Sequence, residues 1–277
     1  MPWIFTIVKD KMNHFLPKNI YDSLKHGWKL RRVCFYTSTA RTRERFVRTK
    51  LGSFWIGLSN LISISLLSLV YTTVFKIENM KNYTLYLGIG IVIWNALSTS
   101  ISSASNLLIQ NEQKIKNTNI HPIFYSVEEW LFQIQSFFQS FSLIIITLSI
   151  LKLTLIPNLI IFGILPLLNF IIFIYWFPLL VCLIGVKFRD IYQLVPIMLQ
   201  LIFLLSPILY MKENLGNLEW IINLNPIYLI LDHIRDAILF GEIKIESILI
   251  IFLFNICGLY ISIGSLNKSR KFLPFLL

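Results

Sequence analysis

Six long stretches of this chain contain no Asp, Glu, Lys or Arg. They are residues 51–75, 82–111, 130–151, 153–186, 191–211 and 247–267. The shortest has 21 residues, and a helix of about 20 apolar residues crosses a hydrocarbon core about 30 Å thick. Lipid offers backbone amides no partners, so each stretch has to make its own helical hydrogen bonds. The pattern predicts an all-α integral membrane protein with six transmembrane helices.

The alternative, a soluble protein with six buried helices, is disfavoured by the scarcity of charge. Only 14% of the residues are charged and 56% are hydrophobic, whereas a soluble domain carries about 25% charged residues. The net charge of +11 would suit nucleic acid if the cations gathered on a soluble polar face. They gather beside apolar stretches instead, so we expect membrane lipids as partners and no nucleic acid.

The expected helices begin and end near the limits of these stretches. They cover about residues 54–75, 83–105, 130–151, 158–186, 192–210 and 247–266. Pro157 is expected to mark a turn before the fourth helix. Pro166 and Pro178 lie inside that helix and should bend it, because each removes a backbone donor.

The distribution of Lys and Arg predicts the orientation of the chain. Counted over alternate connections, one side of the membrane carries 19 basic residues and the other carries 6. Basic residues are retained in the cytoplasm, so both termini are expected there. This gives a cytoplasmic arm at 1–50, a transmembrane domain at 51–267 and a cytoplasmic tail at 268–277.

The cytoplasmic arm contains a candidate interfacial helix. Tyr21, Leu24, Trp28 and Val33 follow a roughly helical spacing, with basic residues between them. Such a pattern is typical of a basic amphipathic helix lying in the plane of the membrane surface. A solvated arm with a chance periodicity is the alternative.

Sequence signals for catalysis and for metal binding are weak. The four His and three Cys residues are scattered without the spacing of metal ligands. Glu128 and Glu129 are adjacent acids, and we interpret them as a solvated helix start, where acidic side chains complement the helix dipole. We therefore expect a transport protein without metal, without a cofactor of its own and without a nucleotide site.

The connection at 212–246 carries a second amphipathic pattern. Asn225 and Pro226 are typical of the first residues of a helix, and Gly241 is typical of the residue after its end. Apolar residues recur on one expected face, at Ile227, Ile230, Leu231, Ile234 and Ile238. The opposite face is expected to carry Asp232, His233, Arg235 and Asp236. The pattern predicts a short re-entrant or surface helix at the outer, periplasmic boundary.

Two connections on the cytoplasmic side are also unusual. Residues 106–129 are polar and long enough for a short helix that protrudes from the membrane, and residues 187–190 form a tight turn. A chain without a nucleotide site needs a separate motor if it moves a solute, and such protrusions are where a motor would bind. They are otherwise ordinary loops.

Three segments resemble the permease subunits of ABC-2 type transporters. RFVRTKLGSFW at 45–55 is similar to the start of that family's first membrane helix, with matches at Arg45, Leu51, Gly52 and Trp55. Ser53 replaces the usual Pro, which implies a gentler break there. FRDIYQLVPIMLQLIFLLSPILY at 188–210 and NPIYLILDHIRDAILFG at 225–241 resemble later blocks of the family. The blocks follow the family order, so the resemblance covers about residues 30–270.

Within that family the sequence is most similar to permeases that export lipopolysaccharide O-antigen, with capsule and teichoic acid exporters as relatives. The resemblance implies a bacterial inner membrane protein that works as two copies of this chain with two copies of a cytoplasmic ATPase, which binds ATP and Mg²⁺. It also implies a coupling helix within 111–122 and a second contact at the 187–190 turn. The residues assigned to coupling are Asn111, Lys114, Asn117, Asn119, His121, Pro122, Arg189 and Asp190.

The resemblance also directs attention to residues for a polyprenyl-linked polysaccharide. Basic side chains that match phosphate oxygens and are candidates for its pyrophosphate are Arg41, Arg43, Arg45, Arg48 and Lys50. Aromatic candidates for the glycan path are Trp55, Tyr71, Phe75, Tyr83, Tyr86 and Trp94. Topological anchoring explains the cations equally well, and an interfacial aromatic belt explains the rings.

Two other functions compete with polysaccharide export. An ABC-2 exporter of a drug or small lipid would share the fold. A polyprenyl-dependent glycosyltransferase would need acidic residues near a membrane face. Asp232 and Asp236 are the one spaced aspartate pair, and Arg235 beside them explains them by ion pairing, so an enzyme is disfavoured.

Overall fold

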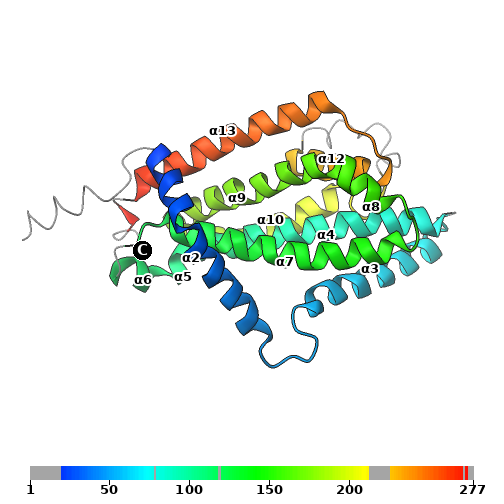
Figure 1. Ribbon diagram of the computed structural model, residues 1–277, viewed down its shortest axis with the longest axis horizontal. Helices are drawn as coiled ribbons and strands as arrows, with labels where there is room; N and C mark the ends of the chain where they lie inside the picture. The colour runs from blue at the N-terminus through cyan, green and yellow to red at the C-terminus, as the bar shows by residue number, and fades with distance from the viewer. Residues whose placement is uncertain (1–19, 78, 118–119, 212–224, 271, 274–277) are drawn as a thin grey trace, which may run out of the picture.

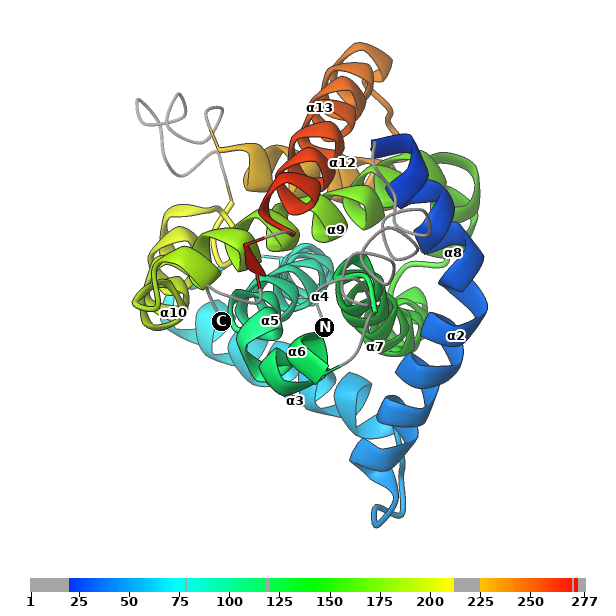
Figure 2. The same ribbon diagram turned by 90° about the vertical axis from the view of Figure 1, so that its left-hand side faces the viewer.

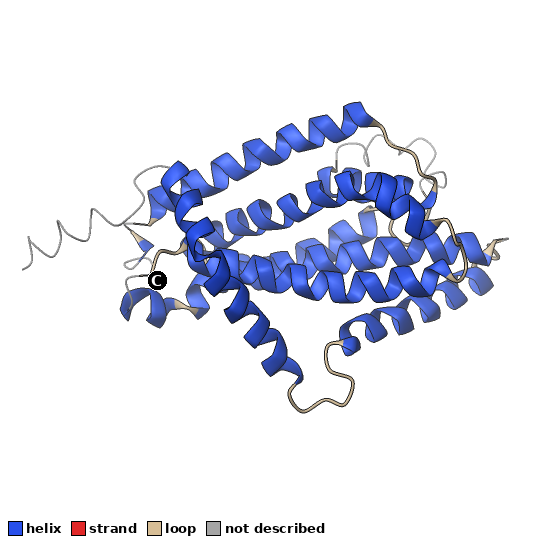
Figure 3. Ribbon diagram, in the orientation of Figure 1, coloured by secondary structure: helices blue, strands red, loops and turns tan. Residues whose placement is uncertain are grey.

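The computed structural model describes residues 20–77, 79–117, 120–211, 225–270 and 272–273, and this part of the chain is built of helices (Figures 1 and 3). Five helical stretches are long and apolar enough to cross a membrane. They are α3 (Phe54–Val74), α4 (Met80–Ser105), α7 (Ile123–Ser149), the continuous stretch Leu155–Lys187 and α13 (Ile245–Ser269). The prediction of an all-α, multi-pass membrane protein is therefore confirmed for the described residues.

The remaining helices are shorter or lie outside the spans. They are α2 (Ile20–Phe46), α5 (Leu107–Gln110), α6 (Glu112–Asn117), α10 (Ile191–Leu205) and α12 (Pro226–Leu239). The stretch Leu155–Lys187 is divided into α8 (Leu155–Asn158), the π-helical turn η1 (Leu159–Gly163) and α9 (Ile164–Lys187). Pro166 lies in the first turn of α9, three residues after the end of η1. It cannot donate a backbone hydrogen bond, so the helical hydrogen-bond ladder is irregular in this region. Pro157 lies within the first turn of α8, where a missing amide proton is tolerated, rather than in a turn before the helix.

The fifth apolar stretch differs most from expectation. The predicted helix at 192–210 ends at Leu205 in the structure, after 15 residues. At about 1.5 Å per residue this is about 22 Å, less than the hydrocarbon core. Ser206 has an extended backbone, with φ −85° and ψ 138°, because the residue before a proline avoids the helical region. The count of six long transmembrane helices is therefore not confirmed, and the chain continues past Ser206 as irregular backbone.

Helix α4 lies at the centre of the bundle. Figure 2, which looks along the bundle from the α5–α6 end, shows α3, α7, α9 and α10 arranged around it. The residues of α4 from Leu87 to Trp94 are all buried. A helix that is apolar on all sides suits this central place.

Helix α13 packs along α9 on the side away from α3 (Figures 1 and 2). A buried polar group joins the two helices: Trp176 Nε1 donates to Asn255 Oδ1 at 2.8 Å, and Asn255 Nδ2 donates to the carbonyl of Asn169 at 3.1 Å. Gly258, one turn further along α13, lies directly against the indole of Trp176. Interhelical hydrogen bonds and small residues are the usual means by which helices associate in lipid.

Helix α2 is longer than the sequence pattern predicts and runs obliquely across α7 (Figure 1). The face it presents to the bundle consists of small side chains, at Ser23, Gly27, Cys34, Ser38 and Thr42. The apolar residues Leu24, Trp28 and Val33 point outward, with Trp28 69% exposed. The expected helix is present, and its place in the membrane surface stays a prediction that this outward apolar face favours.

Helix α12 has the capping and the apolar face predicted from the sequence. The Asn225 side chain accepts hydrogen bonds from the amides of Ile227 and Tyr228 at 3.0 and 3.4 Å, and Gly241 has a φ of +72°. The five apolar residues predicted to share a face are all buried. The first part of the predicted 212–246 segment, residues 212–224, lies outside the described residues.

Arg235 does not lie on the solvated face to which the sequence pattern assigned it. Its side chain is 1% exposed and is buried between α12 and α4. Its guanidinium donates to the carbonyls of Pro207 and Ile208 at 2.7 and 3.2 Å and lies 3.7 Å from the ring of Tyr86. Arg235 is buried because the irregular backbone after α10 leaves carbonyls without helical donors, and its guanidinium donates to two of them.

Candidate functional site

A polar cavity of about 480 Å³ lies between α2, α3, α4 and α7. Three of these helices, α3, α4 and α7, are candidate membrane spans, and polar side chains within a span are costly in lipid and are usually kept there for function. The polar residues that line it come from all four helices. They are Arg41, Arg45, Ser59, Asn60, Asn95, Thr99, Ser102, Ser103, Glu129, Gln133, Ser136 and Ser140.

Side-chain amides connect the walls of the cavity. Asn95 Nδ2 on α4 donates to Asn60 Oδ1 on α3 at 2.8 Å, and Asn60 Nδ2 donates to Ser140 Oγ on α7 at 2.6 Å. Gln133 Nε2 on α7 donates to Ser103 Oγ on α4 at 2.9 Å and to Glu129 Oε1 at 2.8 Å. Three helices are thereby held around the cavity, and Ser136 Oγ in its wall has no hydrogen-bond partner among the described residues.

Helix α2 closes one side of the cavity through an ion pair. Arg41 Nη1 donates to Glu129 Oε2 at 2.5 Å, and the Arg41 guanidinium lies 4.3 Å from the ring of Phe132. Glu129 is 4% exposed, so its predicted place at a solvated helix start was wrong. The helix in fact begins at Ile123, seven residues before the predicted residue 130, so both acids lie within the helix.

We expect Arg41 and Glu129 to be energetically coupled. In a double-mutant cycle of Arg41→Gln and Glu129→Gln, measured by thermal unfolding in detergent, the two losses should fall short of additivity by about 0.5–2 kcal/mol. The estimate is modest because the Arg41 side chain is 42% exposed. The matched cycle of Arg41→Gln with Glu112→Gln, a half-buried acid paired with Lys116, should be additive. Additivity in both cycles would show that the ion pair does not hold α2 to α7.

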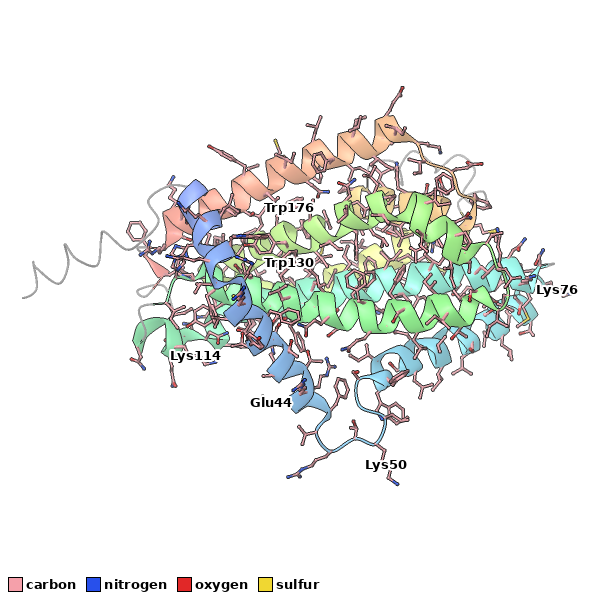
Figure 4. The ribbon with its side chains drawn as sticks, in the orientation of Figure 1. Glu44, Lys50, Lys76, Lys114, Trp130 and Trp176 are labelled. Carbon is pink, nitrogen blue, oxygen red and sulfur yellow. The ribbon has the colours of Figure 1, made fainter. Side chains whose placement is uncertain are left out.

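The structure separates the five cations proposed for pyrophosphate into two groups. Arg41 and Arg45 line the cavity. Arg43, Arg48 and Lys50 are exposed and do not line it. Figure 4 shows Lys50 at the tip of the α2–α3 connection, pointing away from the bundle, and Glu44 on the last turns of α2. Gly52 in this connection has a φ of +57°, a conformation that glycine adopts without strain.

The aromatic residues proposed for a glycan path are also divided. Tyr83 and Trp94 are buried: the Tyr83 hydroxyl donates to the Leu209 carbonyl at 2.6 Å, and Trp94 packs against Phe203 with centroids 5.5 Å apart. Trp94 also lines a separate opening of about 270 Å³ between α4 and α10. Tyr86 donates to the Pro207 carbonyl at 2.9 Å. These three residues hold the irregular backbone after α10, or the helix before it, against α4.

Three other aromatic candidates lie nearer the surface. Trp55 and Phe75, at the two ends of α3, are exposed, and Tyr71 is half-buried and stacks on Phe75 with centroids 5.0 Å apart. Their role in a path stays a prediction.

The residues proposed for coupling gather at one end of the bundle. Helices α5 and α6 protrude there, beside the end of α9, and Figure 4 shows Lys114 at this end. Lys114 and Asn117 are exposed and Asn111 is half-buried, while Arg189 and Asp190 are exposed in the turn between α9 and α10. Asn119 lies outside the described residues.

His121 and Pro122 are buried and have a different environment. The Nδ1 atom of His121 accepts a hydrogen bond from the amide of Ile123 at 3.1 Å, which satisfies a free donor at the start of α7. Burial, aided by Arg270, lowers the pKa of His121 to about 3, so the ring stays neutral and keeps this acceptor. His121 therefore caps the start of α7, next to the protruding segment, and is not itself exposed there.

The most informative residues were not assigned a role from the sequence. Asn60, Asn95 and Gln133 are amides inside charge-free stretches, and Glu129 precedes Gln133 by one helical turn. A search for amides in predicted spans, and for polar pairs four residues apart, would have found them.

Comparison with known proteins identifies the family. The family model for the ABC-2 type transporter matches residues 34–239, well over half of the chain. Two proteins of Klebsiella pneumoniae, each named O-antigen export system permease protein RfbA, are 24% and 22% identical to it over 232 and 231 residues. Each alignment covers 82% of this chain and 88% of the relative. The chain belongs to the ABC-2 type transporter family.

Proposed function

We propose that this chain is the permease subunit of an ABC exporter that moves a lipid-linked cell-surface polysaccharide of the O-antigen type across the bacterial inner membrane. The observation that carries the proposal is the polar cavity inside a lipid-embedded bundle, with Arg41 and Arg45 in its wall. A lipid-linked glycan has an anionic diphosphate beside polar sugars, and these two kinds of group find complementary partners there. The similarity to two O-antigen permeases supports the same substrate class.

The proposed assembly contains two copies of this chain and two cytoplasmic ATPase subunits, which bind ATP and Mg²⁺. The start of α2 and the end of α13 lie at the end that carries α5 and α6, and this end is proposed to face the cytoplasm, with both termini. In addition to the five long spans, α10 and the irregular residues 206–211 are proposed to cross the membrane together. This proposal is supported by the hydrogen bond between the Leu209 carbonyl and Tyr83, which lies in the first turn of α4. Helix α12 lies at the periplasmic end.

Deletion of the gene tests the substrate class. We expect loss of surface polysaccharide and accumulation of lipid-linked glycan on the cytoplasmic face. Export of a capsule or teichoic acid polymer would instead remove that polymer. A drug or small-lipid exporter, which shares the fold, would leave all surface polysaccharides unchanged and thus contradict the proposal.

The protruding segment should be needed for coupling to the ATPase. Replacement of residues 111–117 by a Gly/Ser linker should abolish glycan export and permease-dependent ATP hydrolysis, because α6 and its exposed Lys114 would be lost. His121 and Pro122 stay in place so that α7 keeps its start. Insertion into the membrane, measured by fractionation, should be unchanged. Normal export by this variant would show that the ATPase does not act through the α5–α6 protrusion.

The cations near the cavity should contribute unequally to export. Arg45→Gln should impair glycan export by about tenfold, since Arg45 lines the cavity, whereas Arg48→Gln should have a smaller effect because Arg48 does not. Export is measured by lipopolysaccharide gels and scaled to the amount of membrane-inserted protein. Equal effects of the two changes would favour general anchoring to anionic lipid. Unchanged export in both would exclude a phosphate-binding role.

A further inference from the structure

The cavity has a composition that neither lipid packing nor phosphate binding explains. Beyond Arg41 and Arg45, its polar lining consists mainly of hydroxyl and amide groups, carried by Asn60, Asn95, Gln133 and a set of Ser and Thr residues. Phosphate sites favour clustered cations, and helix contacts in lipid are normally closed by such groups without leaving space. Its charged groups are Arg41, Arg45 and Glu129, and Glu129 is paired with Arg41. The remaining polar groups are uncharged donors and acceptors around an open space, which suits a neutral polyhydroxylated ligand.

We propose that this cavity binds the sugar that is attached directly to the lipid diphosphate, and so selects the first residue of the glycan. The inference rests on the proposed function, because it takes the position of the diphosphate from Arg41 and Arg45. With the diphosphate at these cations, the sugar next to it is the part of the substrate that can reach Asn60, Asn95 and Gln133 on the facing walls.

The size of the cavity limits what it holds. Its volume of about 480 Å³ falls within the range of about 300–1,000 Å³ typical of small-ligand sites. It accommodates the end of a glycan and not a polymer, so the rest of the chain passes elsewhere. The selected feature is therefore the identity of the first sugar, independent of the length and repeat of the polysaccharide.

The walls offer both hydrogen bonds and apolar contact to such a ring. Phe132 and Phe137 line the cavity together with the polar groups, and an apolar ring face combined with directed polar groups fixes the orientation of a ligand. Ser136 Oγ, which also lines the cavity, is buried and has no hydrogen-bond partner among the described residues. A buried hydroxyl without a partner is costly, and a sugar hydroxyl would supply one.

The test compares two soluble probes on the full chain in nanodiscs of zwitterionic lipid. One probe is farnesyl diphosphate, and the other is farnesyl diphosphate that carries a single sugar, prepared with N-acetylglucosamine and with galactose. Equilibrium dialysis should show that at least one sugar-bearing probe binds about tenfold or more tightly than the bare diphosphate. This comparison uses the wild-type chain and does not depend on a variant that folds.

Two variants locate the effect. Asn95→Leu should remove most of the advantage of the sugar-bearing probe while leaving the affinity for farnesyl diphosphate unchanged. Ser142→Leu, on an exposed position of α7 that does not line the cavity, should behave as the wild type. Retention of the full advantage in Asn95→Leu would overturn the assignment to this cavity.

The outcomes separate this inference from the proposed function. Equal binding of bare and sugar-bearing probes would overturn sugar recognition and leave diphosphate binding, and with it the proposed function, intact. No binding of any probe above that of empty nanodiscs would contradict the diphosphate role of Arg41 and Arg45, and the inference would fall with it.

Discussion

Arg235→Met should destabilise the end of the bundle that carries α12 and strongly reduce export. Methionine keeps an apolar stem of similar length but removes the donors to the Pro207 and Ile208 carbonyls. Two buried carbonyls without donors correspond to a loss of about 2–5 kcal/mol. Thermal unfolding in detergent measures the loss. Lys244→Met, at an exposed cation just after α12, is the matched control and should unfold like the wild type.

Gly90 provides an internal check on this prediction. A Cβ atom at Gly90 would overlap the Arg235 guanidinium, so Gly90→Ala should be destabilising in the wild-type background. In the Arg235→Met background the same change should cost much less, because the flexible methionine can move aside. Additive losses would contradict the contact between α4 and Arg235.

Gly258→Leu should separate α13 from α9 and destabilise the protein by about 2–4 kcal/mol. The added side chain would occupy the space of the Trp176 indole, which has no other place in this contact, and would also break its 2.8 Å hydrogen bond to Asn255. The neighbouring Cys257 is exposed, so Cys257→Leu, outside the contact with Trp176, is the matched control. If both variants were destabilised equally, or if neither were destabilised, the α9–α13 contact would not be close-packed at Gly258.

The helices that could be predicted from the sequence are those whose limits are set by composition. Charge-free stretches located α3, α4 and α13 to within a few residues, since lipid requires every backbone group to be paired within its own helix. The capping pair Asn225–Pro226 and Gly241 likewise identified α12. These features depend on local chemistry alone.

The errors occurred where a distant partner changes the preference of a residue. Glu129 was assigned to solvent because its partner Arg41 is 88 residues away in the sequence. Arg235 was assigned to a polar face for the same reason, since the carbonyls it pairs with belong to the backbone after α10. The polar cavity could not be predicted, because it depends on where α2 lies and on amides from three other helices. The periodicity of one helix gives no information on how separate helices meet. The composition of the cavity was visible in the sequence, and its assembly was not.

ATP-driven movement of a lipid-linked glycan is the most direct test of the central claim. Proteoliposomes should contain this chain, its ATPase subunit and a polyprenyl diphosphate-linked oligosaccharide. Glycan on the outer face is measured by its sensitivity to an added glycosidase. We predict that, with ATP, the glycan becomes progressively resistant to the glycosidase. Transporters whose ATPase faces outward carry the glycan from the outer face into the lumen, where the enzyme cannot reach it. The change should be absent without the permease. Resistance that develops equally without ATP, or not at all while ATP is hydrolysed by the complete assembly, would contradict the account.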